Sequence, residues 1–426
     1  MFPLTACVRL NQWQRVALVV WVALLLGVGT RVVLRPGRQT VGGIFAKAGR
    51  DWLAGTDVYG LDRPASGVQA PQSFGDLFHP TFRPPVGWGL VSYRYSPLVA
   101  GLFVPLGLMP ERLGELLLRL ANAAALVAGA LWWLRRAAPY PLSRAEQGFF
   151  LLALVPFSMG SINNGQTNPL LLGLLLAAMT ACAERRFTLA SLFVGLAFWL
   201  KMYPLAFGLL LAVAYPRQLG WRLPLAVLLL GAAAFLLQRP AYVANEYLTF
   251  VRVLTLDDRS DWPPRLAYRD LLLLCRVWGL PLSAEAYTAV RLATAALVAA
   301  LVLAGRRWPV RRRLCSLLNL GLCWVLLFGP ATEGATYQLL GPALAWAMID
   351  AWRRGRPLAR AVALASAGAF GVGLAANLFP FAADVHALGP HPLSALLLFG
   401  LLVGLDLRDL LRPAPSEVVS PLAPAA

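Results

Sequence analysis

Charge is scarce in this sequence, and negative charge most of all. Only 14% of the 426 residues are charged, with 20 acidic residues against 38 Lys and Arg. The three His and five Cys show no metal-ligand spacing, so the sequence predicts neither a metal site nor a disulfide framework. We interpret the cysteines in or beside apolar runs as small core hydrophobes: Cys182, Cys275, Cys315 and Cys323.

Apolar residues dominate instead, at 58% of the chain, in several runs of roughly membrane-spanning length. This pattern predicts an all-α, polytopic membrane protein. The formal net charge of +18 comes from short groups of Lys and Arg beside apolar runs, not from one basic face. Membrane topology therefore explains the positive charge better than binding of nucleic acid does, and we expect membrane lipids as partners.

We expect about twelve spans in a single membrane domain over residues 1–411, followed by a disordered cytoplasmic tail at 412–426. The first span follows Arg9 and Arg15 and resembles a signal peptide. It has no convincing small-x-small cleavage site, so we interpret it as uncleaved. The expected spans are 16–34, 113–134, 145–162, 169–183, 188–200, 205–214, 223–237, 284–304, 314–328, 338–351, 361–379 and 392–407.

Two long outer loops are expected, at 39–94 and 239–283. In the first, residues 41–54 have the pattern of an amphipathic helix. The apolar segment 96–109 is too short to cross the membrane, so we predict a re-entrant or interfacial segment.

Positive charge predicts the orientation. The short connections on one side contain sixteen Lys and Arg, whereas those on the other side contain Lys201 alone. Because Lys and Arg are retained in short cytoplasmic loops, we expect both termini to be cytoplasmic and the polar loops extracytoplasmic, in the plasma (inner) membrane. A rival interpretation fuses 188–214 into one broken helix, but it disrupts this alternation. The basic connections are 135–144, 184–187, 216–222, 305–313 and 352–360, and the opposite ones are 161–168, 201–204, 329–337 and 380–391.

A polar segment at residues 161–168 interrupts two apolar runs and contains Asn163, Asn164, Gln166 and Asn168. Asn and Gly favour tight turns, so a simple turn is one interpretation. Gln166 and Asn168 are amides that a turn does not require. Because unpaired amides are costly in hydrocarbon, the segment is either a polar turn or part of a site.

Four motifs occur in order along the first half of the chain. They are Ala48-Gly49-Arg50-Asp51-Trp52-Leu53-Ala54-Gly55 with Tyr59, Tyr93-Arg94-Tyr95-Ser96-Pro97-Leu98, Asn164-Gly165-Gln166 with Asn168, and Gly195-Leu196-Ala197 with Lys201 and Pro204. With these motifs the chain resembles glycosyltransferase family 87, a family of polytopic mannosyltransferases of the GT-C class, over about residues 40–215. The second half resembles the family only in its spans and loops.

The resemblance implies a GT-C-like fold and an outward-facing site that transfers sugar from a polyprenyl-phosphate donor with inversion. It implies no metal and no cofactor. A carboxylate of the first outer loop would be the general base. Family members carry an acid just after the first span, but residues 40–45 here contain none. Either another carboxylate serves, or the chemistry is altered.

The reaction requires a base, cations for the leaving phosphate and polar groups for sugar hydroxyls. Lys201 is the strongest phosphate candidate, although a lysine at this position also suits snorkelling to the membrane surface. The candidate bases are Asp51, Asp258 and Glu333. The candidate substrate-binding residues are Arg94, Tyr95, Asn164, Gln166, Asn168, Lys201, Tyr203 and Arg259.

The leading hypothesis is therefore a hexosyltransferase that moves mannose from a polyprenyl-phosphate donor to a lipid, glycan or protein acceptor on the extracytoplasmic face. A transporter or flippase is the rival, against which stand the two long loops and the absence of repeat symmetry. A non-catalytic remnant of the transferase fold is the third interpretation.

Overall fold

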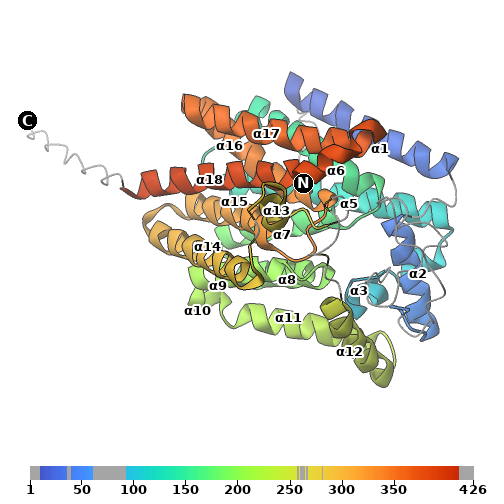
Figure 1. The fold of residues 1–426 in the computed structure, drawn as a ribbon. Helices are drawn as coiled ribbons and strands as arrows, with labels where there is room; N and C mark the ends of the chain where they lie inside the picture. The colour runs from blue at the N-terminus through green and yellow to red at the C-terminus, as the bar shows by residue number, and fades with distance from the viewer. Residues whose placement is uncertain are drawn as a thin grey trace, which may run out of the picture.

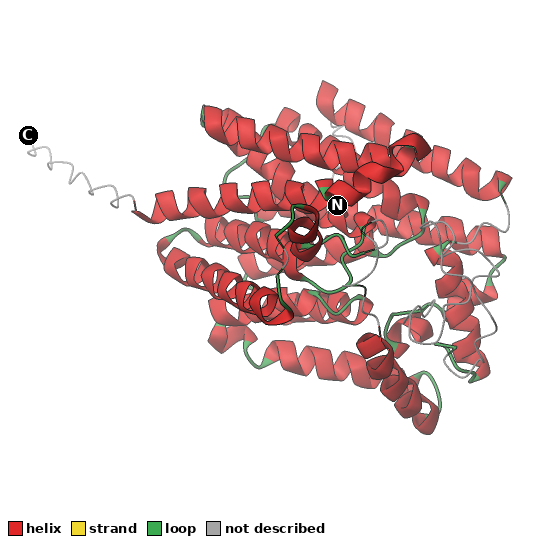
Figure 2. Cartoon of the chain, viewed as in Figure 1, coloured by secondary structure: helices red, strands yellow, loops and turns green. Residues whose placement is uncertain are grey.

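The computed structural model describes residues 10–35, 40–60, 93–256, 259, 264, 267–280 and 282–411, without the side chains of 256 and 380–383. Within these ranges the regular structure is helical and includes no strand (Figure 2). Asp258 and the expected tail at 412–426 lie outside the described residues.

The helices form one bundle with its long axes roughly aligned (Figure 1). In order they are α1 (Gln12–Leu34), α2 (Val41–Ala54), α3 (Pro97–Leu102), α4 (Val104–Leu108), α5 (Glu111–Arg136), α6 (Arg144–Asn163), α7 (Asn168–Ala183), α8 (Phe187–Leu200), α9 (Pro204–Ala214), α10 (Pro216–Leu219), α11 (Arg222–Ala233), η2 (Ala234–Leu236), α12 (Pro240–Leu256), α13 (Leu271–Val277), α14 (Ala284–Ala304), η3 (Gly305–Arg307), α15 (Val310–Phe328), η4 (Gly334–Leu339), α16 (Leu340–Arg353), α17 (Pro357–Leu378), η5 (Pro380–Leu388) and α18 (Pro390–Leu411).

Seven described helices are long and apolar enough to cross a membrane, and three shorter apolar helices accompany them. The polytopic, all-α prediction is confirmed, and the twelve crossings remain a prediction. α2 occupies the predicted amphipathic segment, with the Thr40 hydroxyl accepting from Gly43 N at its start and Gly55 in the left-handed region (φ +68°) at its end. The predicted short segment 96–109 forms α3 and α4.

α8 and α9 form an antiparallel hairpin rather than one broken helix. The ring of Phe187, at the start of α8, lies 5.6 Å from that of Tyr215, just after α9. Halfway along, Gly208 lies against Val194. Lys201 therefore occupies the turn of the hairpin, as the alternation of charged loops predicted.

The bundle has two chemically different ends. At one end, here called the basic end, the arginine-rich connections contact one another: Arg136 lies 3.8 Å from Glu184, Tyr140 donates to Asp350, and Arg313 lies over the Tyr215 ring at 4.5 Å. At the other, here called the polar end, the long loops and the polar turns gather. α2, α3 and α12 lie there, far from α10 at the basic end (Figure 1).

The described parts of the two long loops contact each other at the polar end near the start of α12. Trp52 and Tyr242 make an edge-on ring contact at 5.4 Å, and Gln238 donates to the Trp52 carbonyl. Tyr242 also donates to the Thr56 carbonyl. These contacts fix the end of α2 and the turn that follows it against the start of α12.

Close backbone contact between α5 and α7 fixes the helix that follows the polar segment. A Cβ at Gly129 would clash with the backbone of Gly173, and a Cβ at Gly173 would clash with that of Ala125. Small residues allow this approach between helices. The start of α7 is held as well, since Leu170 N donates to the Asn122 carboxamide at 3.2 Å.

Candidate functional site

The polar segment is a turn whose amides also bind a distant loop. α6 ends at Asn163, Gly165 adopts φ +64°, and α7 begins at Asn168. Asn168 Nδ2 donates to Gln166 Oε1 at 2.8 Å and to the Ala335 carbonyl at 3.0 Å. Ser161 Oγ donates to the same carbonyl. The Asn168 amide nitrogen therefore attaches this turn to η4, while its buried Oδ1 has no hydrogen-bond partner among the described residues.

The turn also attaches the first loop. Val41 N, at the start of α2, donates to the Asn164 carbonyl at 3.0 Å. A second link lies nearby, where Ser96 Oγ donates to the Trp199 carbonyl at the end of α8. Tyr59 Oη donates to the Tyr95 carbonyl, so the segment that carries Arg94 and Tyr95 is held on both sides.

Glu333 forms the centre of a group of charged residues at the polar end. Its carboxylate lies 3.4 Å from Arg259, whose side chain is 4% exposed, while the Glu333 side chain is 27% exposed. The backbone of Glu333 is fixed at the start of η4, where its N–H donates to Thr336 Oγ1. The Glu333 carboxylate is thus held by a buried guanidinium and still partly exposed.

Arg269 joins the same loop through its backbone and side chain. Its N–H donates to the Thr332 carbonyl at 2.6 Å, and the buried Tyr337 hydroxyl donates to the Arg269 carbonyl at 2.7 Å. Its guanidinium donates to the carbonyls of Pro264 and His386. The second long loop thus places two buried cations, Arg259 and Arg269, beside the start of η4.

Lys201 faces this group from the α8–α9 turn. Burial lowers the pKa of Lys201 to about 8, with Glu333 acting in the opposite direction and Arg94 in the same one. The ammonium also lies 5.9 Å from the centre of the Tyr203 ring. The structure therefore brings Lys201, Arg94 and Glu333 within electrostatic range, although they come from three separate segments of the chain.

Tyr95 and Tyr203 lie between these charges. Burial raises the pKa of both phenols above the ordinary range, with Glu333 adding to the shift at Tyr95 and Tyr95 adding to that at Tyr203. Both hydroxyls therefore stay neutral at physiological pH and remain able to donate hydrogen bonds. The Tyr95 ring packs against Phe45 of α2 at 4.5 Å.

Asp51 lies apart from this group. It pairs with Lys47, one turn earlier on α2, and the described contacts of the pair include none of the charged residues around Glu333. Such a pair at i,i+4 spacing is a common stabilising contact of a helix surface. Asp258 cannot be placed, although its neighbour Arg259 belongs to the group.

Sequence reasoning missed a buried carboxylate, Glu115, inside the predicted span 113–134. It pairs with Arg119 on α5 and accepts a hydrogen bond from the Thr40 hydroxyl. A Cβ at Gly42 would lie only 2.6 Å from Glu115 Oε1. A carboxylate from α5 thus lies against residues 40–42, where the first loop has no acid. Two charges within an apolar run were the available signal.

Beside Glu115 a cavity of about 290 Å³ lies between the end of α1, the start of α5 and the end of α6. Four arginines line it. Of the predicted site residues, none lines this cavity, which borders the polar turn only through Asn163.

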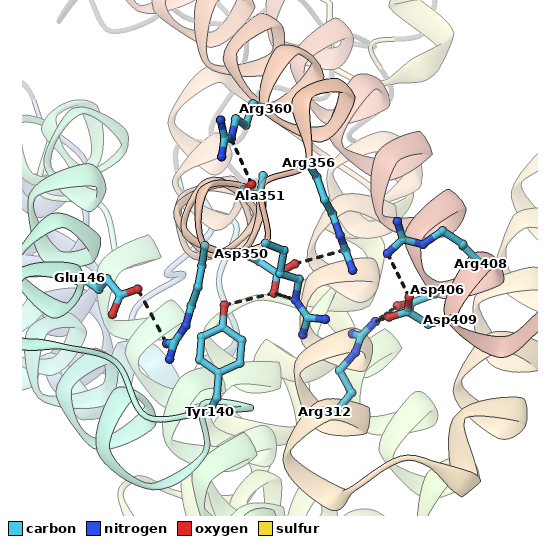
Figure 3. A network of polar contacts seen from close by, with 12 residues as sticks. Tyr140, Glu146, Arg312, Asp350, Ala351, Arg356, Arg360, Asp406, Arg408 and Asp409 are labelled. Carbon is cyan, nitrogen blue, oxygen red and sulfur yellow. Dashed lines mark hydrogen bonds and ion pairs between the residues drawn. The ribbon is translucent and has the colours of Figure 1, made fainter. Parts of the chain in front are cut away.

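A further polar network occupies the basic end (Figure 3). Asp350 accepts from Tyr140 at 3.1 Å and from Arg354 at 2.7 Å. Asp406, which is 3% exposed, binds Arg312 and the Ser316 hydroxyl of α15. Each of these carboxylates is matched by an arginine: Asp406 joins α18 to α15, and Asp350, near the end of α16, binds Tyr140 in the connection between α5 and α6.

No group of three or more His, Cys, Asp or Glu side chains suited to a metal ion occurs among the residues the structure describes.

The model of glycosyltransferase family 87 matches residues 93–330, which is more than half of the chain. The match begins after the 48–59 motif and extends well beyond residue 215. It contains the predicted substrate-binding residues, from Arg94 to Arg259, and ends just before Glu333.

The chain is also similar to GPI mannosyltransferase 1 of Dictyostelium discoideum. The two are 32% identical over 123 residues, which is 28% of this chain and 27% of that protein. The chain therefore matches about a quarter of the length of this curated relative.

Proposed function

The chain belongs to glycosyltransferase family 87, and from this premise we propose that it moves a hexose, specifically mannose, from a polyprenyl-phosphate sugar to a lipid, glycan or protein acceptor. One observation carries the proposal. Arg259 lies 3.4 Å from the Glu333 carboxylate at the polar end, and Lys201, from a separate segment, lies within electrostatic range of both Glu333 and Arg94. The mannosyltransferase named above supports mannose as the sugar.

The cations suit the phosphate of the donor. Transfer leaves the lipid phosphate with the electrons of the broken C1–O bond, and fixed positive charge stabilises that negative charge. Arg259 suits bidentate contact with phosphate oxygens, and Lys201 adds a compact charge. In our proposal the phosphate binds between them, with the Tyr95 and Tyr203 hydroxyls donating to the phosphate or the sugar.

Glu333 is the base that we propose. An acceptor hydroxyl gives its proton to the Glu333 carboxylate while its oxygen forms the new bond to C1 of the sugar. Attack opposite the leaving phosphate inverts the configuration at C1. Glu333 combines partial exposure with a fixed backbone and proximity to Lys201. Asp258, next to Arg259 in sequence, is the second candidate, and Asp51 the third.

The orientation belongs to the same proposal. The basic connections gather at one end of the bundle, and the charged group around Glu333 lies at the other. Because Lys and Arg are retained in cytoplasmic loops, we place the basic end and both termini in the cytoplasm of a plasma-membrane protein. The Glu333 end is then extracytoplasmic.

The test is transfer of labelled sugar by the purified full chain in lipid, with a panel of polyprenyl-phosphate sugars. We expect labelled product from polyprenyl-phosphate-mannose, and strong loss of product in Lys201→Ala. Glu184→Gln, at the basic end, is the matched control. Donor binding without product would support a catalytically inactive remnant, and movement of unchanged donor across the bilayer would support a flippase. Either result refutes the transferase proposal.

A further inference from the structure

The cavity beside Glu115 is a candidate binding site separate from the charged group around Glu333. Its wall combines the last turn of α1, the first turn of α5 and Asn163 at the end of α6. Its volume of about 290 Å³ is close to the lower limit of roughly 300 Å³ for small-molecule pockets. None of Lys201, Arg259 and Glu333 lines it.

The charge of the cavity is positive. Four arginines and two glutamates line it. Arg119 neutralises Glu115, and Arg119 is itself only 2% exposed. Across the described residues, no carboxylate forms an ion pair with Arg31, Arg35 or Arg112. Once the Arg119–Glu115 pair is set aside, the cavity lining retains three arginines, Arg31, Arg35 and Arg112, and a single carboxylate, that of Glu111.

Two of the guanidinium groups are held in place by one residue. Arg31 Nη1 donates to the Asn163 carboxamide at 3.1 Å, and Arg119 Nη2 donates to the Asn163 backbone carbonyl at 3.1 Å. The buried Arg119 Nε has no hydrogen-bond partner in the described part of the chain. Fixed arginines with remaining donors suit an oxyanion with several oxygens, such as a phosphate.

The surroundings of the cavity are apolar on the α1 side. Val28 and Val32 line it, and α1 exposes Leu18, Val19 and Leu26 further along its length. Only 17% of the apolar stretch of α1 is buried within the protein. A ligand with a charged head and a hydrocarbon tail therefore matches both parts of this surface.

We infer that this cavity binds the phosphate head group of an anionic membrane lipid, with the hydrocarbon tail along α1. The arginines hold the phosphate oxygens, and Thr40, Glu115 and Arg119 form the floor of the site. The inference does not depend on the transfer reaction, because it rests on residues outside the group around Glu333.

The experiment measures lipid binding to the full chain in detergent by native mass spectrometry, with phosphatidylglycerol as the anionic probe and phosphatidylcholine as the neutral one. The test variant is Arg35→Ala with Arg112→Ala. Both side chains are exposed, and no described group forms a hydrogen bond with either. The fold should therefore persist, which the melting temperature checks. The matched control is Arg306→Ala with Arg307→Ala, two exposed arginines of the basic end.

We expect the wild type to prefer phosphatidylglycerol and the test variant to lose roughly tenfold or more in affinity for it, with the control unchanged. Equal binding of the two lipids, or equal losses in test and control variants, would overturn the inference. A parallel titration with sodium phosphate distinguishes the source of the phosphate. If inorganic phosphate displaces the lipid at low millimolar concentration, the site takes free phosphate and the lipid assignment is wrong.

Discussion

The two ends of the bundle use the same residue types for different purposes. At the basic end, Asp350 and Asp406 each bind arginines and hydroxyl groups within the protein. At the polar end, the Glu333 carboxylate pairs with Arg259 and lies within electrostatic range of Lys201. Carboxylates bound by several internal partners stabilise a fold, whereas cations gathered beside a partly exposed carboxylate fit the anionic donor that we propose.

Burial makes this difference energetically important. A charge in a low-dielectric interior is costly unless it is paired, so the buried Arg259 requires a partner such as the Glu333 carboxylate. The lowered pKa of Lys201 reflects the same cost of burying a charged group. The following variants separate the two roles, from the largest expected effect to the smallest.

The largest effect on stability is expected from Asp406→Ala. The change leaves Ser316 without its acceptor and Arg312 with Asp409 alone, 3.4 Å away. Breaking a buried pair costs about 3–5 kcal/mol, and we expect a loss toward the lower end of that range, about 3 kcal/mol. The melting temperature of the purified protein in detergent should fall strongly, while transfer per folded molecule stays close to that of wild type. An unchanged melting temperature would show that the basic end does not stabilise the bundle.

A smaller effect, on donor binding, is expected from Lys201→Ala. Loss of a charge-assisted hydrogen bond to phosphate costs about 1.5–3 kcal/mol, so the KM for the donor should rise roughly 10- to 100-fold. The melting temperature should change little or rise, because removing a buried charge relieves its desolvation cost. Initial rates over a range of donor concentrations measure the effect. An unchanged KM would indicate that Lys201 does not bind the donor and that its ammonium only extends toward the membrane surface.

The pH dependence should follow the same lysine. With its pKa lowered to about 8, Lys201 is mostly protonated at pH 7 and loses its charge as the pH rises through 8. The KM for the anionic donor should therefore rise by up to about tenfold per pH unit above 8. Lys201→Arg keeps its charge over this range. If its KM rises with pH as in wild type, another group causes the change.

The smallest effect is expected from Arg136→Ala at the basic end. Its contact with Glu184 is 3.8 Å long, and the Arg136 side chain is 67% exposed. Exposed pairs of this kind contribute less than about 1 kcal/mol. Melting temperature and transfer rate should both remain close to wild type. A loss as large as that in Asp406→Ala would remove the distinction between buried and exposed pairs at this end.

The sequence was sufficient to predict most of the helices and their grouping. Apolar runs predicted the helical bundle, and the alternation of basic connections placed Lys201 in a turn rather than within a helix. These features depend on local pattern and on charge in short loops, both visible in one sequence. The gathering of polar loops at one end followed from the same alternation.

The partners of individual side chains were less accessible. Asn168 was predicted to bind substrate, and this role stays a prediction: its Nδ2 donates to Gln166 and Ala335, whereas its buried Oδ1 has no hydrogen-bond partner among the described residues. Glu115 was overlooked because its contacts with Thr40 and Gly42 join segments more than seventy residues apart. Such pairings are set by how helices pack against loops, which no local pattern records. The choice of Glu333 among the acids likewise required its contact with Arg259.

The most direct test of the central claim is the rate of sugar transfer per folded molecule in Glu333→Gln. The substitution keeps the size of the side chain and removes the proton acceptor, so we expect the rate to fall about 100-fold or more with little change in melting temperature. A Glu333→Gln protein that transfers sugar as fast as wild type would contradict the account of the polar end as the catalytic site.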